Sequence, residues 1–208
     1  MPFSFQNKYE MTDNEYIKLI LQGERQKFRI FVERYQQMVF RTCMGFVHNR
    51  EDADELTQDV FIQAYQSLPD FKMESAFSTW LYRIAVNASL NKVRKSRKTN
   101  FFQLIGSYLG GSDQEALLVS APDPDDPEKI LIKQEHSQWL RNALDSLPEN
   151  QRTAIVLSKY DDLPQREIAR IMNITEGAVE ALLQRAKKNL RKNLSGDKEK
   201  KKKQRRKI

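Results

Sequence analysis

Acidic side chains gather in one short stretch of the first half of the chain. Five acidic residues lie between Glu51 and Asp59, and three of them, Asp52, Glu55 and Asp59, are spaced by three and four residues. That spacing puts their carboxylates on one face of a helix. Such a face is usually just solvated, but it can also meet a basic partner. With one Cys and two His in the whole chain, no multi-ligand zinc site is expected.

A second stretch, at 77–98, combines aromatic and cationic residues. Trp80 and Tyr82 lie close to Arg83 and Asn87, and five Lys or Arg residues follow between positions 92 and 98. Aromatic rings can stack on bases while cations contact the phosphate backbone. This combination of residues is typical of binding sites for single-stranded DNA. The alternative for Trp80 is packing in the core, and we expect part of the indole to do so.

A third stretch, from Gln165 onward, has the pattern of a helix-turn-helix. Small Ala169 suits the helix crossing, Asn173 tolerates the left-handed backbone of the turn, and Thr175 can cap the second helix. The second helix is strongly basic in its C-terminal half, which favours contact with phosphate. An ordinary helical hairpin with a solvated basic face would share this pattern.

Helices must position these residues, since apolar side chains recur every three or four positions in two blocks. In the first block we expect helices from about residue 13 to 22, around 28–46, over 51–67 and from about 75 to 97. In the second we expect them over 128–144, 148–160, 165–172 and 175–194. The expected core of the first block is Phe28, Phe31, Tyr35, Val39, Phe46, Ala53, Leu56, Val60, Ala64, Phe77, Leu81, Ile84 and Ala88.

No strand-type alternation is seen, so the sequence predicts an all-α fold of two helical domains. Residues 113–128 hold three prolines and six acidic residues, which is typical of an extended linker. We therefore expect a first domain at 1–99, a flexible acidic linker at 100–127, a second domain at 128–194 and a basic disordered tail at 195–208.

Charge and composition narrow the class of protein. The formal net charge is +7, but residues 195–208 hold eight basic and two acidic residues, so the rest of the chain carries only +1. We expect a soluble, cytoplasmic protein with no membrane insertion, because no apolar stretch approaches the roughly 18 residues of a membrane span. Cys43 could act as a redox sensor, but a lone Cys in an apolar helix is more often a small core residue, so we expect it in the core. No nucleotide-cradling glycine motif or catalytic constellation is found, so neither a cofactor nor enzymatic activity is expected.

Four motifs in order resemble the extracytoplasmic-function (ECF) sigma factors of bacterial RNA polymerase. They begin at Arg50 (REDADELTQDVFIQA), Phe77 (FSTWLYRIAVN), Leu147 (LPENQR) and Gln165 (QREIAR). The resemblance implies an initiation factor that binds core polymerase, directs it to promoters and helps to open the minus-ten element. It implies that the linker threads the RNA exit path, and that an anti-sigma factor controls the protein.

The resemblance also implies residue roles. The clamp of the largest polymerase subunit would be bound by Asp52, Glu55, Leu56, Gln58, Asp59 and Phe61. The minus-ten element would be held by Trp80, Arg83, Asn87, Lys92 and Arg94, with the loop at 69–75 taking a flipped base. The minus-thirty-five element would be read by Arg166, Glu180, Gln184, Arg185 and Lys188. Glu180 and Leu182 depart from the basic residues frequent in the family, which leaves the minus-thirty-five sequence open.

Two other classes of protein are weighed against this interpretation. A stand-alone regulator would use the helix-turn-helix without polymerase, but it leaves the acidic face and the aromatic helix unexplained. A nucleic-acid enzyme such as a recombinase would need a nucleophile or a carboxylate metal cage in the first block. The carboxylates there lie along a single helix, so this class is the weaker alternative.

Overall fold

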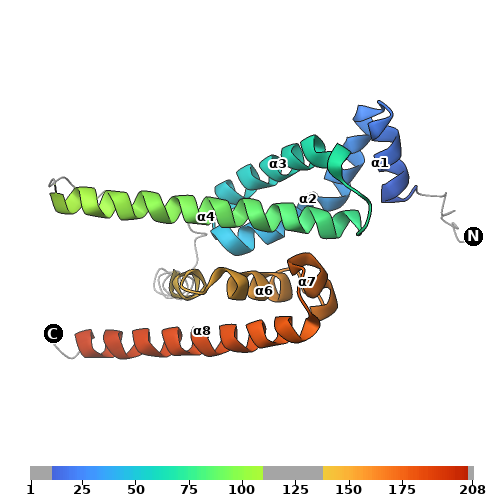
Figure 1. The fold of residues 1–208 in the computed structure, drawn as a ribbon. Coiled ribbons are helices and arrows are strands. Elements are labelled where there is room, and N and C mark those ends of the chain that lie inside the picture. Colours follow the sequence, from blue (N-terminus) through green and yellow to red (C-terminus); the bar gives the residue numbers. More distant parts are fainter. Residues whose placement is uncertain (1–10, 110–137, 206–208) are drawn as a thin grey trace, which may run out of the picture. The chain divides into compact units, whose positions relative to one another are not determined.

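A computed structural model describes residues 11–109 and 138–205, and within these ranges it contains helices and no strand. The all-α prediction is thereby confirmed. The chain divides into two compact units: the first is built around α1 to α3 and the start of α4, up to Ser89, and the second mainly around the helices from Leu90 onward (Figure 1).

The first unit begins with α1 (Asp13–Leu21), where the sequence predicts it. Thr12 caps this helix in a capping box: its hydroxyl accepts a hydrogen bond from the Glu15 amide at 3.4 Å, and the Glu15 carboxylate accepts one from the Thr12 amide at 2.7 Å. The helix ends before Gly23, whose φ of 112° is one that other residues rarely adopt.

Three longer helices follow, and their apolar faces meet in one core. They are α2 (Arg29–Val47), α3 (Arg50–Ser67) and α4 (Phe77–Leu109), with a short 3-10 turn at Leu68–Asp70. The rings of Phe31 and Phe77 stack with centroids 4.2 Å apart in this core. Cys43 is fully buried in it, as expected.

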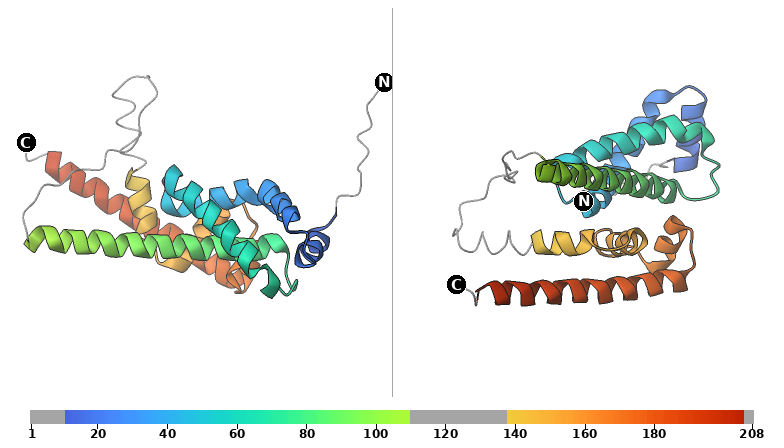
Figure 2. Two further views of the ribbon diagram at one scale, coloured as in Figure 1. Left: turned by 90° about the horizontal axis from the view of Figure 1, so that it is seen from above. Right: turned by 60° about the vertical axis from the view of Figure 1, so that its left-hand side comes forward.

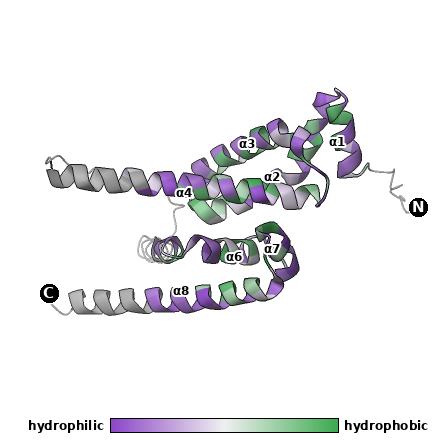
Figure 3. Cartoon of the chain, viewed as in Figure 1, coloured by the Kyte–Doolittle hydropathy of each residue, from purple (hydrophilic) through white to green (hydrophobic). Residues whose placement is uncertain are grey.

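The second unit contains a helical segment at 138–145, α6 (Glu149–Lys159), α7 (Gln165–Met172) and α8 (Glu176–Arg205). Pro148 precedes α6, where its fixed φ suits a helix start. In Figure 3, α8 begins with apolar residues and becomes hydrophilic further along. Residues 128–137 of the expected first helix lie outside the described ranges.

Two expected limits differ from the structure. α4 continues through residues 100–109, which were assigned to the linker, and Figure 2 shows it as one long helix. This stretch has no proline, and two glycines follow it in the sequence. α8 likewise includes residues 195–205, which were expected to be disordered, because Lys, Glu, Gln and Arg favour helix. The remaining expected linker, 110–127, lies outside the described residues.

Candidate functional site

The acidic helix is α3, and its start is fixed by a side-chain cap. The Asn49 side-chain oxygen accepts hydrogen bonds from the amides of Glu51 at 2.8 Å and Asp52 at 3.4 Å. The acidic residues of the first turn also face the positive end of the helix dipole. The local sequence thus both starts the helix and favours negative charge there.

The outer face of α3 presents only some of the residues expected to bind polymerase. Glu55, Gln58 and Asp59 are exposed and Asp52 is half-buried. Leu56 and Phe61 are 4% and 7% exposed and belong to the core. Leu56 is thus in the core, as its spacing predicts, and Phe61 lies there too; their contribution to polymerase binding stays a prediction.

The same face carries an apolar residue that the sequence analysis missed. Ile62 is 56% exposed, and at about 100° per residue it falls within about 100° of Glu55, Gln58 and Asp59 around the helix. Tyr65, one turn further, is 38% exposed. The sequence does indicate this exposure, because Ile62 lies on the side of the helix opposite to the buried row of Ala53, Val60 and Ala64.

On α4 most of the expected minus-ten residues form one stripe. At about 100° per residue, Trp80, Arg83, Asn87 and Arg94 fall within about 60° of one another. Asn87 and Arg94 are exposed, whereas Trp80 and Arg83 are half-buried. Lys92 is also half-buried, but it lies about 120° around the helix from Trp80 and so outside this stripe.

Trp80 is held by other aromatic side chains. Its ring centroid lies 4.8 Å from that of Phe71 and 5.5 Å from that of Phe77. Part of the indole packs against the core, as expected, and part remains accessible. The ring is therefore fixed in orientation while keeping surface on which a base could stack.

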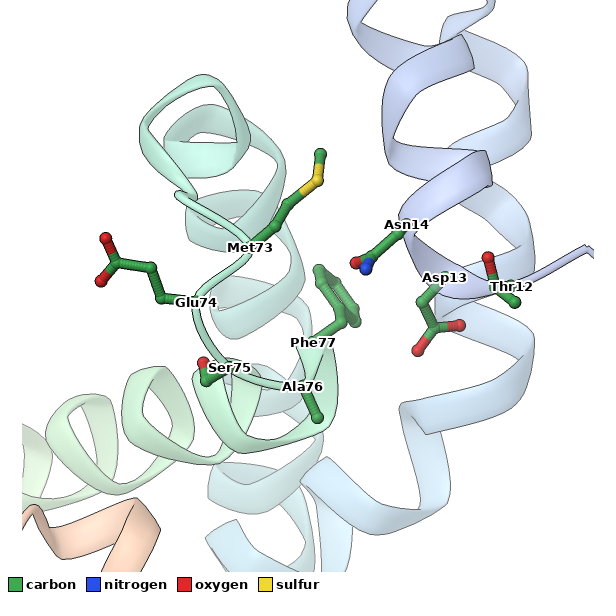
Figure 4. A pocket seen from close by; sticks show the side chains of 8 residues that line it. All are labelled: Thr12, Asp13, Asn14, Met73, Glu74, Ser75, Ala76 and Phe77. Carbon is green, nitrogen blue, oxygen red and sulfur yellow. The ribbon is translucent and has the colours of Figure 1, made fainter.

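The loop before α4 forms one side of a pocket. The pocket has a volume of about 390 Å³ and is lined by residues 73–77 and by Thr12, Asp13 and Asn14 of the α1 N-terminus (Figure 4). Met73 has a φ of 55°, a left-handed conformation that is costly for a non-glycine residue. The family resemblance implies a base-binding loop at 69–75, but nothing in the sequence indicates that α1 forms the other wall of this pocket.

The helix-turn-helix has the predicted geometry. Asn173 adopts a φ of 54° in the turn, and the Ile174 amide donates a hydrogen bond to the Ala169 carbonyl at 3.0 Å. The Thr175 hydroxyl accepts a hydrogen bond from the Ala178 amide at 3.2 Å, which caps α8. Ile168 and Val179 are fully buried at the crossing.

All five expected minus-thirty-five residues are exposed on this unit: Arg166, Glu180, Gln184, Arg185 and Lys188. The Glu180 carboxylate accepts a hydrogen bond from the side-chain amide of Gln184 at 3.2 Å. The two side chains therefore orient each other along one row of α8.

A buried arginine supports this unit and had no role in the sequence analysis. Arg152 is 2% exposed, and its guanidinium donates hydrogen bonds to the Leu144 carbonyl at 3.2 Å and the Asp145 carboxylate at 2.5 Å. Burial lowers the pKa of this guanidinium, and the nearby Asp145 charge partly offsets that effect. Arg152 lies in the motif at 147–152. The motif is visible in the sequence, but the buried position of this arginine is not.

Other classes of site are not found in the described ranges. No helix there combines the length and apolar character that a membrane span requires. Residues 11–109 and 138–205 also contain no group of three or more His, Cys, Asp or Glu side chains placed to share a metal ion.

Comparisons with known proteins match both units. The family model for Sigma-70 region 2 matches residues 31–99, and that for Sigma-70, region 4 matches residues 137–190. The chain is 31% identical over 185 residues to the ECF RNA polymerase sigma factor SigW of Bacillus subtilis, covering 89% of this chain and 98% of that protein.

Two solved structures share the fold. CnrH, in complex with the cytosolic domain of CnrY, matches with a TM-score of 0.59 at 21% identity, covering 89% of this chain and 98% of that one. The sigma factor RpoE of Bartonella quintana, in complex with the anti-sigma factor NepR, matches with a TM-score of 0.53 at 20% identity, covering 81% and 96%.

Proposed function

This chain belongs to the ECF RNA polymerase sigma factors of the sigma-70 family, and on that premise we propose that it binds core RNA polymerase, directs it to specific promoters and helps to open the minus-ten element. The observation that supports this most is the occurrence, in one chain, of an aromatic and cationic stripe on α4 and a capped helix-turn-helix ending in α8. Each suits a different promoter element, one unpaired and one duplex.

Core polymerase is proposed to bind the outer face of α3. The exposed carboxylates of Glu55 and Asp59 would meet basic residues of the clamp of the largest subunit, with half-buried Asp52 and exposed Gln58 beside them. Ile62 and Tyr65 add apolar surface next to the charges. Interfaces commonly combine an apolar centre with a polar rim, so this face suits a specific contact better than a merely solvated helix would.

The minus-ten element is proposed to lie along the α4 stripe. Stacking on Trp80 and contacts to Arg83, Asn87 and Arg94 would hold the separated strand, with Lys92 adding charge from the side of the helix. Unpairing a base costs a few kcal/mol, and stacking on an aromatic ring returns about 1–3 kcal/mol per base. Stacking on Trp80 would therefore recover part of the cost of unpairing, and the contacts to Arg83, Asn87 and Arg94 would contribute the rest.

The minus-thirty-five element is proposed to be read by α8 in the major groove. Arg166, Arg185 and Lys188 would contact phosphate or base edges. Gln184 and Glu180 orient each other and would act together, and a carboxylate at Glu180 can accept a hydrogen bond from cytosine N4. Glu180 would therefore favour a G·C pair with its cytosine turned toward the helix at the position that it contacts.

The partner set and location follow from the same proposal. The protein would act in the cytoplasm without catalytic activity of its own, and the acidic linker, most of which lies outside the described residues, would thread the RNA exit path. An anti-sigma factor is proposed as a further partner, as NepR is for the B. quintana RpoE. The exposed α3 face is the surface that such a protein would need to cover.

The test is capture of core polymerase by the tagged chain, compared with an Asp52→Lys, Asp59→Lys double variant. The control, Glu24→Lys with Glu33→Lys, makes the same charge change at exposed positions on the same unit. We expect the parent and the control to retain core and the α3 variant to lose it.

Three other results would each favour a different conclusion. If the parent fails to bind core but binds duplex DNA, the chain is a stand-alone regulator. Cleavage or joining of DNA by the purified chain would point to an enzyme. If the α3 variant binds core as the parent does, the proposed contact face is wrong.

A further inference from the structure

We propose that Asn14, in the first turn of α1, reads the base of one unpaired minus-ten nucleotide and so determines promoter preference at that single position. This inference rests on the proposed function, because it takes single-stranded promoter DNA on α4 as its starting point. α1 lies before residue 31, where the match to the Sigma-70 region 2 family model begins. The pocket wall that α1 contributes therefore lies outside the residues that the family model matches.

The pocket beside Asn14 has the two kinds of wall that an extruded base requires. Met73 and Ala76 supply apolar surface from the loop, and the buried Phe77 lies beneath them at the start of α4, while Asn14 points toward Met73 and Phe77 from α1 (Figure 4). Extruded bases are held by stacking against such side chains and by hydrogen bonds to their edges. The volume of about 390 Å³ belongs to an open depression that a side group of a passing strand can enter.

The neighbours of Asn14 are already engaged. The Thr12 hydroxyl donates to the Glu15 carboxylate at 2.9 Å as part of the capping box. The two carboxylate oxygens of Asp13 accept hydrogen bonds from Arg34 at 2.8 Å and from Tyr35 at 2.5 Å. Asn14 is exposed and lines the pocket, and its carboxamide carries both a donor and an acceptor.

Asn14 is also held in a fixed place. Ile17 and Ile20 bury the inner face of α1, and the Arg34 guanidinium lies 5.3 Å from the centre of the Tyr16 ring. Together with the two bonds to Asp13, these contacts fasten the first turn of α1 to α2. A polar group on such a fixed helix can select among ligands, because little order is lost when it binds.

The pocket adjoins the proposed path of the strand. Ala76 lines the pocket, and Trp80 lies one helical turn after it, with the Trp80 amide donating a hydrogen bond to the Ala76 carbonyl at 3.2 Å. A strand whose base stacks on Trp80 therefore brings the neighbouring nucleotide to the mouth of the pocket. This adjacency is the reason to assign the pocket to a promoter base and not to a free small molecule.

The chemistry of the carboxamide allows a directed test. An Asn side chain both donates and accepts, whereas an ionised Asp only accepts. Asn14→Asp should therefore shift the preference at one position toward bases with an exocyclic amine, which are adenine, cytosine and guanine, and away from thymine. Asn14→Ala should reduce discrimination at that position about ten-fold, the scale of one lost base contact.

The experiment is transcription by reconstituted holoenzyme from a promoter library randomised over the minus-ten element, with transcripts sequenced. The parent, Asn14→Ala and Asn14→Asp are compared with Asn150→Ala and Asn150→Asp, which make the same changes at an exposed Asn of α6. Thermal unfolding of each variant checks that α1 remains folded. We expect the two Asn14 variants to differ from the parent at one position only, and the Asn150 variants to match the parent.

Failure of this inference is distinguishable from failure of the proposed function. If the parent holoenzyme does not initiate from any member of the library, the proposed function fails. If it initiates and both Asn14 variants keep the parent preference at every position, the role of Asn14 is wrong. A loss of base preference spread evenly over several positions, in variants that unfold normally, would also overturn the role of Asn14. Such a loss would indicate a general weakening of DNA binding.

Discussion

The hydroxyl of Tyr35, on α2, donates a hydrogen bond of 2.5 Å to the carboxylate of Asp13, in the first turn of α1. Burial raises the pKa of this hydroxyl, and the bond to the Asp13 carboxylate raises it further. The bond joins α1 to the long helices across 22 positions of sequence. It therefore fixes the wall of the pocket as well as the fold.

Tyr35→Phe should lower the free energy of unfolding by about 1 kcal/mol, the usual value of one partly exposed bond to a charged group. The parent should also lose this contribution as the pH rises above about 10, where an unfolded tyrosine ionises, because a raised pKa means that folding favours the protonated hydroxyl. Urea unfolding at pH 8 and pH 11, followed by Trp80 fluorescence in a Trp139→Phe background, measures both. Equal pH dependence in the Phe variant would contradict the assignment.

Local features of this fold were predictable, whereas contacts between distant segments were not. Thr12 as a cap, Asn173 in a left-handed turn and the row of Ala53, Val60 and Ala64 all follow from rules that span a few residues. The pocket joins Asn14 to Met73, which are 59 positions apart, and no local rule brings them together. The burial of Leu56 also follows from its spacing, whereas the family motif alone does not say which face of α3 Phe61 occupies.

Arg152 provides a second test of stability, now in the unit that contains the helix-turn-helix. Arg152→Ala removes both bonds and leaves a cavity, so it should cost about 2–4 kcal/mol. Arg152→Met keeps most of the packing and avoids burying a charge, and should recover more than half of that loss. Unfolding followed by Trp139 fluorescence in a Trp80→Phe background reports on this unit. A Met variant as unstable as the Ala variant would show that the ion pair, and not the packing, dominates.

Trp80→Ala should impair strand opening more than binding to duplex promoter DNA. Stacking of a base on the indole contributes about 1–3 kcal/mol, or roughly 5- to 150-fold in the open fraction. A fluorescent base analogue in the minus-ten element measures opening, and gel mobility measures total binding by holoenzyme.

The control for this experiment is Trp80→Phe, which keeps an aromatic ring against Phe71 and Phe77 and should retain most of the opening. Equal loss of opening and of duplex binding in the Ala variant would mean that Trp80 acts only through the core. The same conclusion would follow if the Phe variant opened promoters no better than the Ala variant.

Arg185→Ala on α8 should weaken promoter binding, and the pattern of the loss identifies the contact. A loss of about 1–3 kcal/mol for some minus-thirty-five sequences only would indicate a base contact, whereas a uniform loss with a shallower salt dependence would indicate phosphate. Binding by holoenzyme to a panel of minus-thirty-five variants at two salt concentrations separates the two. No loss on any sequence would remove Arg185 from the interface.

The tail extends α8 as far as Arg205 and holds nearly all of the net charge of the chain. Removing residues 196–208 should therefore make the salt dependence of DNA binding less steep, by about 0.9 in the log–log slope for every phosphate that the tail neutralises. Because phosphate contacts carry no sequence information, promoter choice should not change.

Truncation also shortens α8, so a matched variant is needed. This variant replaces Lys200, Lys201, Lys202 and Lys203 by Gln in the full chain. It removes four charges while preserving helix propensity. It should reproduce a large part of the change in slope. If truncation changes promoter choice but the Gln variant does not, the tail acts by supporting the geometry of α8 and not through its charge.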